Sequence, residues 1–306
     1  MADDVRAAVE WVCRQAGLDA GRRRLLRRHA SVVVRVDEAV VVKLAPATPD
    51  NLTRSTTAVR MASWLVSLGF PAVRPAYPSA LSWIPESGGS GWVATLWEYL
   101  PQPAQPVTPR PVAPLGRLLR ELHQLPAPSF TLPTVRPLRR LCDTVTADAA
   151  RPTPVLSAGD RAFLTDRIDE LLTAYAGLRF ALPSGVIHND AYPGNLLVDP
   201  RSRYGYVLAD WDPAGIGPRE IDLIAVGAPE NRFGRDPDER RLFVAAYGWD
   251  VASWEGWRVL AAIRELHSIG AYLRAAPVKP AALAELRLRL ETLRTGDRSR
   301  LWHVVP

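Results

Sequence analysis

Two short polar stretches in the second half of the sequence carry the residue types that phosphoryl transfer requires. Residues 188–195, the first polar loop, contain His188, Asp190 and Asn195, and residues 209–212, the second polar loop, contain Asp210 and Asp212. Phosphoryl transfer from a nucleotide requires a carboxylate that receives the proton of the acceptor hydroxyl, and oxygen ligands for Mg²⁺. Catalysis is then mainly positioning and charge neutralisation. The pattern predicts Asp190 as the base, Asn195 and Asp210 as metal ligands, and His188 as a structural residue.

The alternative for these residues is a connector rich in turns, because Asp, Asn, Gly and Pro are the usual residues of loops. That alternative leaves unexplained why Asp210 follows Asp190 by 20 positions with an apolar strand between them. Asp212 is either a further site residue or, as we favour, an acid that braces the loop.

A lysine in an apolar run provides a second functional candidate. Lys43 stands within the run 40–44 and is one of two lysines in the chain. A lysine among apolar strand residues is costly to desolvate unless an anion meets it. We therefore expect Lys43 to bind phosphate, the alternative being an edge-strand lysine that faces water.

Together these residues resemble the aminoglycoside phosphotransferase superfamily, small-molecule kinases related to the protein kinases. The catalytic loop of that family reads His-Gly-Asp-x-x-x-x-Asn and its metal loop reads Ile-Asp-[Trp/Phe]-Asp or similar, and the two polar loops stand in their places. The run 217–223 also resembles the Gly-Pro-x-x-x-Asp-Leu run of actinobacterial members. The resemblance covers about residues 20–300.

This resemblance implies a kinase that uses ATP and Mg²⁺ to phosphorylate a hydroxyl group of a small molecule. Lys43 would hold the nucleotide phosphates, Ser31 could donate to a phosphate, and the backbone of Glu98 and Leu100 would hydrogen-bond adenine. Acceptors in the family include antibiotics, choline-like alcohols and sugars, so an antibiotic or a sugar is expected here. The implied fold is α+β, with a β-rich N-terminal lobe and a mainly helical C-terminal lobe.

Two departures from the family pattern concern the N-terminal lobe. The family places a glutamate on the helix after the lysine strand, yet no acidic residue occurs between Asp50 and Glu86, and Arg54 lies in the expected window. Either another carboxylate such as Asp210 reaches Lys43, or the lobe is poorly ordered for ATP. The second case corresponds to a pseudokinase that binds nucleotide or acts as a scaffold without turnover. The loop 28–31 also lacks the Gly-x-Gly of protein kinases.

The periodicity of apolar residues predicts the elements that position these side chains. We expect helices over 4–16, 51–67, 115–124 and 159–176, a hairpin of 31–36 with 39–44, and strands over 91–97, 195–198 and 204–209. From residue 219 onward the sequence predicts helices. Six prolines within 101–114 indicate a hinge or linker. The expected domains are therefore a nucleotide-binding lobe 1–100, the hinge 101–114 and a C-terminal lobe 115–306.

The composition is that of a folded globular protein, which excludes disorder as its main state. Of the 306 residues, 47% are hydrophobic and 23% are charged. The net charge of +6 comes from dispersed arginines, apart from a run over 22–28 that we place at a helix end as a solvated face. We therefore expect no nucleic-acid partner.

The remaining features concern the compartment. No apolar run reaches the roughly 18 residues of a membrane span, and the first residues do not resemble a signal peptide. Cys13 and Cys142 cannot form a disulfide framework. We expect a cytoplasmic protein without a membrane partner, and the oligomeric state is left open.

Overall fold

The computed structural model describes residues 3–305 except 20, 22, 29, 30, 86, 87, 89, 90, 231 and 235. The chain divides into two compact units. The first unit comprises Met1–Pro133 with Gly185–Ile216, and the second comprises Thr134–Ser184 with Gly217–Pro306. This grouping places both polar loops in the same compact unit as Lys43, whereas the sequence analysis assigned those loops to the C-terminal lobe.

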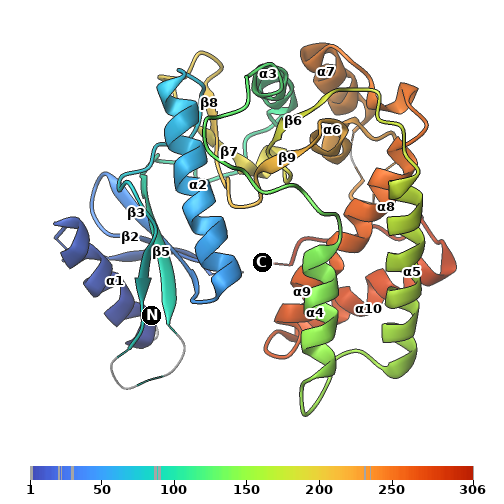
Figure 1. Ribbon diagram of the computed structural model, residues 1–306, viewed down its shortest axis with the longest axis horizontal. Coiled ribbons are helices and arrows are strands. Elements are labelled where there is room, and N and C mark those ends of the chain that lie inside the picture. The colour runs from blue at the N-terminus through green and yellow to red at the C-terminus, as the bar shows by residue number, and fades with distance from the viewer. Residues whose placement is uncertain are drawn as a thin grey trace. The chain divides into compact units, whose positions relative to one another are not determined.

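An antiparallel sheet of five strands, in the order β1-β2-β3-β5-β4, forms the centre of the first unit (Figure 1). The strands are β1 (Arg24–Arg28), β2 (Val32–Arg35), β3 (Val40–Pro46), β4 (Leu81–Trp83) and β5 (Trp92–Glu98). The predicted hairpin is confirmed as β2 and β3, which pair antiparallel. The predicted strand over 91–97 is confirmed as β5, which pairs with β3 so that Lys43 lies opposite Thr95.

The arginine-rich run predicted at a helix end instead leads into strand β1, which contains Arg24, Arg27 and Arg28; Arg23 precedes the strand, and Arg22 lies outside the described residues. Strand β1 pairs antiparallel with β2, with Arg28 opposite Val32. All five side chains of β1 are exposed, so this part of the run is solvated as expected, whereas Arg23 is partly buried and pairs with Glu10. Strand β1 carries no apolar periodicity because it is exposed, and the hydrogen bonds of the neighbouring strand determine its conformation.

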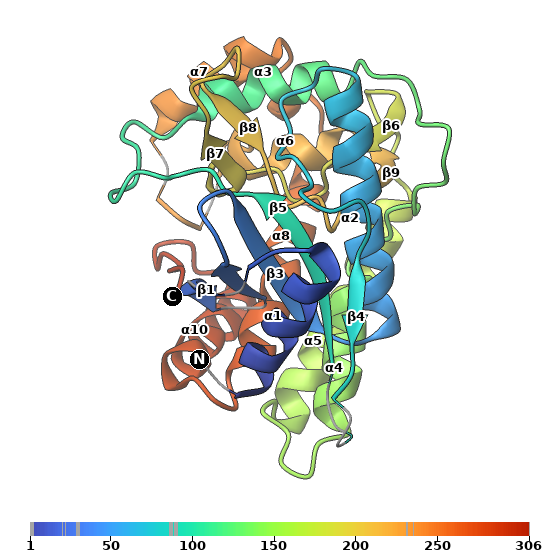
Figure 2. The ribbon, with the colours of Figure 1, turned by 90° about the vertical axis from the view of Figure 1, so that its left-hand side faces the viewer.

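Helices α1 (Asp3–Ala16) and α2 (Pro49–Ser67) lie on opposite faces of this sheet (Figures 1 and 2). Buried residues of α1 form one core with Val42 and Leu44 of β3 and with Leu96 of β5. Successive side chains of a strand point to opposite faces, so Lys43 points to the face of α2. Thr48 begins α2, because its side chain accepts a hydrogen bond from the backbone N–H of Asn51 at 3.2 Å.

A short segment connects the sheet to the strands that flank the polar loops. Strands β7 (Leu196–Val198) and β8 (Tyr206–Leu208) pair antiparallel between the two loops. The N–H of Leu208 donates to the carbonyl of Pro71 at 2.9 Å, and the N–H of Ala76 donates to the carbonyl of Leu96 in β5 at 2.9 Å. Residues 71–76 therefore tie the polar loops to the same sheet that carries Lys43.

Helix α3 (Val112–Leu122) lies in the first unit, and the second unit is mainly helical. Pro114 stands in the first turn of α3, where a proline is tolerated, so this helix begins within the predicted hinge stretch. The helices of the second unit are α4 (Arg139–Ala149), α5 (Ala158–Ala176), α6 (Glu220–Gly227), α7 (Pro237–Tyr247), α8 (Trp257–His267), α9 (Ile269–Ala275) and α10 (Pro280–Thr295). The sheet and these helices confirm the predicted α+β class.

The remaining short elements are strands β6 (Ser184–Ile187) and β9 (Gly215–Pro218), which pair with each other, and the 3-10 turns η1 (Pro193–Asn195) and η2 (Val251–Ser253). Helix α4 was not predicted from the sequence, because few residues of this helix are both apolar and buried. Its buried apolar residues are Leu141 and Val145. Among the described residues, no helix is long and apolar enough to cross a membrane.

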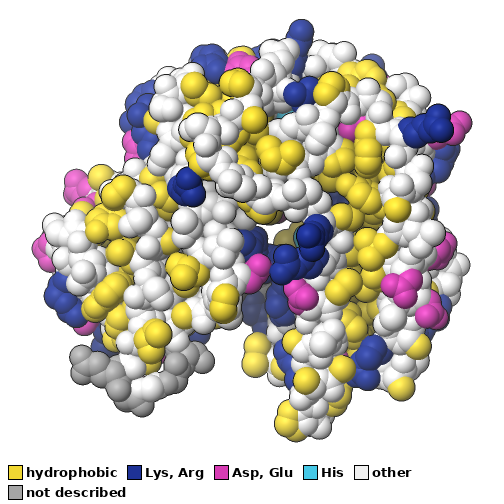
Figure 3. Space-filling model, in the orientation of Figure 1, with side chains coloured by type: hydrophobic (Ala, Val, Ile, Leu, Met, Phe, Trp, Pro, Cys, Tyr) yellow, Lys and Arg dark blue, Asp and Glu magenta, His cyan; other side chains and the backbone are white. Residues whose placement is uncertain are grey.

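Arginine side chains are distributed over the molecule and balanced locally by carboxylates. On the face shown in Figure 3, basic side chains occur in several separate places among acidic and hydrophobic ones. Ion pairs within one unit join Arg23 to Glu10, Arg203 to Glu121 and Arg240 to Asp250. A further arginine, Arg289 of α10, is fully buried and donates to Glu285 at 2.9 Å.

Candidate functional site

Lys43 is held by the two aspartates of the second polar loop. Its Nζ donates to Oδ1 of Asp210 at 2.7 Å and also donates to Oδ2 of Asp212. The side chains of Lys43, Asp210 and Asp212 are 18%, 31% and 15% exposed. Of the two alternatives for Lys43, the structure shows the one in which another carboxylate, Asp210, reaches it; Asp212 is a second partner that was not expected from the sequence.

The pKa values of this triad follow from burial and from one positive charge beside two negative ones. Burial lowers the pKa of Lys43, but the charges of Asp212 and Asp210 outweigh it, so that pKa is raised. Burial raises the pKa of Asp210, but Lys43 outweighs it and holds that pKa well below its usual range. Burial and the nearby Asp210 raise the pKa of Asp212. The ammonium group is therefore retained, and Asp212 takes up a proton before Asp210 does.

Helix α2 contributes a cation where the family places a glutamate. Nε of Arg54 donates to the backbone carbonyl of Asp212 at 3.3 Å. The sequence shows Arg54 in that window, but the contact with the second polar loop depends on the packing of α2. The site therefore combines two basic side chains, Lys43 and Arg54, with two carboxylates.

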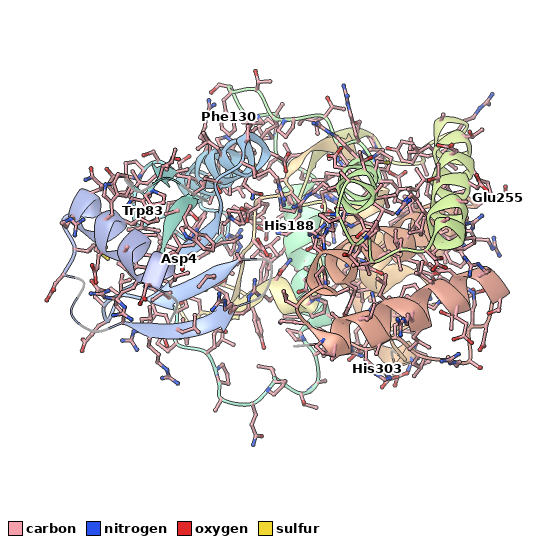
Figure 4. The ribbon with its side chains drawn as sticks, turned by 90° about the horizontal axis from the view of Figure 1, so that it is seen from below. Asp4, Trp83, Phe130, His188, Glu255 and His303 are labelled. Atoms are coloured by element: carbon pink, nitrogen blue, oxygen red, sulfur yellow. The ribbon has the colours of Figure 1, made fainter. Side chains whose placement is uncertain are left out.

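His188 connects the two polar loops from the interior of the first unit. Its side chain, labelled in Figure 4, is fully buried. The carbonyl of Ala209 can only accept, so Nε2 of His188 donates to it at 2.9 Å, and Nδ1 accepts from the N–H of Asp190 at 3.3 Å. The imidazole also packs against Trp211, with ring centroids 4.7 Å apart. These contacts orient the backbone on both sides of the site.

Two residues of the polar loops adopt a left-handed backbone conformation. Asn189 has φ 64° and Asp210 has φ 68°. Asparagine and aspartate tolerate this region better than other residues with a side chain, and glycine adopts it freely. Asn189 therefore satisfies the backbone requirement at the position where the family motif has glycine. Its Nδ2 also donates to the carbonyl of Pro213 at 3.1 Å.

Asn195 is buried at the end of η1 and faces both loops. Its Nδ2 donates to the backbone carbonyl of Asp190 at 2.9 Å, and its own carbonyl accepts from the N–H of Ala209 at 2.9 Å. Because the amide nitrogen is directed to the carbonyl of Asp190, the amide oxygen Oδ1 points away from that carbonyl. One hydrogen bond therefore joins Asn195 to the backbone of Asp190, and a second joins it to Ala209, the residue before Asp210.

Trp211 anchors the second polar loop between its two aspartates. The indole is fully buried and its Nε1 donates to the carbonyl of Leu208 at 3.0 Å. The ring also packs edge to face against Phe70, with centroids 6.1 Å apart. Trp211 was not singled out from the sequence, although an aromatic residue between two acids is a signal that it fills a core position.

The predicted nucleotide residues lie at two other places in the first unit. Ser31 is buried at the start of β2, beside His29 and Ala30 of the predicted phosphate loop, which lie outside the described residues. The backbone N–H of Glu98 donates to the carbonyl of Arg74 at 2.9 Å, and the carbonyl of Leu100 accepts from Gln102 at 3.1 Å.

The side chain of Glu98 forms an ion pair that the sequence analysis missed. Its Oε1 accepts from Arg201 at 2.8 Å, and Arg201 also binds Asp199 at 2.9 Å. Gln102 bridges to the same region, since its Oε1 accepts from the N–H of Val198 at 2.9 Å. Long-range pairs of this kind leave no pattern in a sequence.

The donor set of the site fits a hard divalent cation. Carboxylates of Asp210 and Asp212 with the amide oxygen of Asn195 provide oxygen ligands, and Mg²⁺ is usually held by one or two carboxylates with substrate phosphates and water. Among the described residues, no cluster of three or more His, Cys, Asp or Glu side chains could hold a metal ion.

Comparison with known proteins agrees with this site. Residues 22–263 match the model of the phosphotransferase enzyme family, APH. The chain belongs to this family, which is a family of small-molecule phosphotransferases with a kinase-like fold. Curated proteins provide no match to the sequence.

Solved structures show the same fold at low sequence identity. An amicoumacin kinase, in complex with AMP-PNP, Ca²⁺ and Ami, has a TM-score of 0.65 at 14% identity, over 99% of this chain and 98% of the other. A spectinomycin phosphotransferase with ADP and spectinomycin has a TM-score of 0.59 at 16% identity, over 94% and 93%. A choline/ethanolamine kinase family protein from Mesorhizobium loti has a TM-score of 0.57 at 18% identity, over 97% of each. The predicted kinase-like fold is thereby confirmed.

Proposed function

We propose that this protein transfers the terminal phosphoryl group of ATP, with Mg²⁺, to a hydroxyl group of a small molecule. The observation that carries the proposal is the contact of Lys43 with Asp210 and Asp212. It joins a phosphate-binding cation to two metal-type carboxylates in one compact unit. Asn195 and Asp190 lie in the adjoining loop, tied together by a hydrogen bond of 2.9 Å.

Each of these residues has a role in the proposed reaction. Asp190 orients the acceptor hydroxyl and accepts its proton as the new oxygen–phosphorus bond forms and the bond to ADP breaks. Asn195 and Asp210 hold the metal ion, and Lys43 binds the nucleotide phosphates. When bound, Mg²⁺ would neutralise part of the negative charge of the phosphates. His188 positions the backbone of both loops, and Asp212 is a second carboxylate beside the metal ligands.

The nucleotide would lie along the sheet of the first unit. We assign adenine to the backbone of Glu98 and Leu100, and we assign a phosphate contact to Ser31. The solved relatives support a nucleotide, because their structures hold AMP-PNP or ADP. The run 217–223 is the feature that suggests a member of the actinobacterial type.

The acceptor is an antibiotic or a sugar in this proposal, and ion pairs in the second unit disfavour a polycation. Carboxylates there are paired with arginines: Glu230 with Arg298, Asp238 with Arg241, Asp250 with Arg240, and Glu265 with Arg232. Acids that are already neutralised attract several ammonium groups weakly. A neutral, polyhydroxylated acceptor is therefore the class to screen first.

Replacement of the base tests the proposal. Asp190→Asn should lower turnover by roughly 10² to 10⁴, the usual contribution of a positioned general base, while leaving nucleotide affinity nearly unchanged. Asp166→Asn, on an exposed position of α5, is the matched control and should leave turnover unchanged. ATP consumption is measured against a panel of hydroxylated antibiotics and sugars, and nucleotide affinity by calorimetry.

Two outcomes would contradict these assignments. If Asp190→Asn binds Mg²⁺ and ATP far more weakly, Asp190 is a metal or structural residue. Nucleotide binding in the wild type without turnover on any acceptor would instead favour the alternative function, a pseudokinase-type nucleotide-binding protein.

A further inference from the structure

The ammonium group of Lys43 occupies the position at which a cation would join the two carboxylates of the second polar loop. Its Nζ lies 2.7 Å from Oδ1 of Asp210 and is also hydrogen-bonded to Oδ2 of Asp212. With both carboxylates ionised the three groups carry a net charge of −1, so the lysine neutralises half of the charge that would attract a divalent ion.

We propose that Lys43 is an internal competitor of the metal ion, and that nucleotide phosphates must remove it before the metal binds. This inference rests on the proposed function, since it assigns Asp210 to the metal and Lys43 to phosphate. Metal and nucleotide then bind cooperatively, and the metal alone binds weakly.

Steric exclusion is the first argument for this competition. Mg²⁺ binds oxygen at about 2.0–2.1 Å and requires a nearly octahedral shell. Oδ1 of Asp210, a proposed metal ligand, already lies 2.7 Å from Nζ of Lys43, so a metal ion bound to this oxygen would lie against the ammonium group. The two cations therefore exclude each other in this arrangement.

The second argument is that Lys43 has no carboxylate to move to on helix α2. Within α2, all of which the structure describes, the one acidic residue is Asp50 in the exposed first turn. Arg54 stands in the window of the family glutamate and contacts the backbone of Asp212. A displaced ammonium group of a partly buried lysine requires another anion, because leaving it unpaired is costly. A phosphate group is the anion that the proposed substrate brings.

Metal binding without nucleotide provides the direct test. Mn²⁺ is used as the probe, and free Mn²⁺ is measured by electron paramagnetic resonance with wild type, Lys43→Met and the matched control Lys279→Met. Lys43→Met should bind Mn²⁺ at least about tenfold more tightly than wild type, about 1.4 kcal/mol. Lys279→Met should bind as wild type does. Equal affinity of Lys43→Met and wild type would overturn the proposal.

A measurement on the unaltered protein covers the case in which Lys43→Met fails to fold. The chain has two lysines, so protein labelled with ¹³C-lysine gives two ε-methylene signals, and Lys279→Arg assigns them. Mg²⁺ alone should leave the Lys43 signal in place. Mg²⁺ with AMP-PNP should shift it. A shift with Mg²⁺ alone would show that the metal displaces Lys43 without phosphate, and would refute the proposed requirement for nucleotide.

The two proposals fail in distinguishable ways. If AMP-PNP with Mg²⁺ binds but Mn²⁺ binds wild type and Lys43→Met equally, the competition is wrong and the proposed function stands. If AMP-PNP neither binds nor moves the Lys43 signal with Mg²⁺ present, the proposed function is wrong and the competition falls with it.

Discussion

Removal of the indole of Trp211 should destabilise the first unit and loosen the second polar loop. The side chain is fully buried, donates to the carbonyl of Leu208 at 3.0 Å and packs against Phe70 and His188. Trp211 stands between Asp210 and Asp212 in the sequence, so its packing holds the backbone that carries both carboxylates.

Two substitutions of Trp211 remove different shares of these contacts. Trp211→Ala removes a buried aromatic ring, which costs about 3–5 kcal/mol of folding free energy. Trp211→Phe retains an aromatic ring and loses the hydrogen bond. Because the carbonyl of Leu208 also accepts from the N–H of Val73 at 3.0 Å, it is not left unsatisfied. The cost of Trp211→Phe should therefore be about 1–2 kcal/mol.

Urea unfolding followed by far-ultraviolet circular dichroism measures these differences, with the free energy taken from the midpoint and slope. Mg²⁺-dependent binding of AMP-PNP, measured by calorimetry, reports on the aspartates. Trp211→Phe should keep most of the binding and Trp211→Ala should weaken it. A cost below about 1 kcal/mol for Trp211→Ala, or equal costs for both variants, would refute the anchoring role.

Three further perturbations test local features. Asn189→Gly should be tolerated within about 1 kcal/mol, whereas Asn189→Val should cost at least about 1–2 kcal/mol because φ is 64°; urea midpoints compare them. Hydrogen bonds from Arg201 lower the pKa of Asp199, so its stabilising effect is present above about pH 4 and is lost as the pH falls through the lowered pKa. Asp199→Asn should thus be less stable than wild type at pH 7, and the gap in melting temperature should close in acid. Arg289→Met removes the cation paired with the buried Glu285, whose Oε1 then keeps the hydrogen bond from the N–H of His303; this should cost about 3–5 kcal/mol in thermal unfolding, with partial recovery in the double variant that adds Glu285→Leu.

The chemistry and most of the elements followed from local sequence. Apolar periodicity and capping residues predicted α1, the β2–β3 hairpin, α2, β5 and α5, because these elements bury one regular face. Apolar periodicity did not predict strand β1, whose side chains are all exposed. A strand without a buried face has no pattern, and its conformation depends on pairing with β2.

The types and spacing of Asp190, Asn195 and Asp210 were enough to indicate phosphoryl transfer, since hard-cation ligands and a carboxylate base are local requirements of that reaction. The sequence did not determine the partner of Lys43, because residues 43 and 210 are brought together by the packing of β3 and the loop after β8. The contact with Asp212, the approach of Arg54 and the burial of Trp211 arise in the same way. Contacts between residues far apart in the chain depend on how the elements pack, and no local pattern records them.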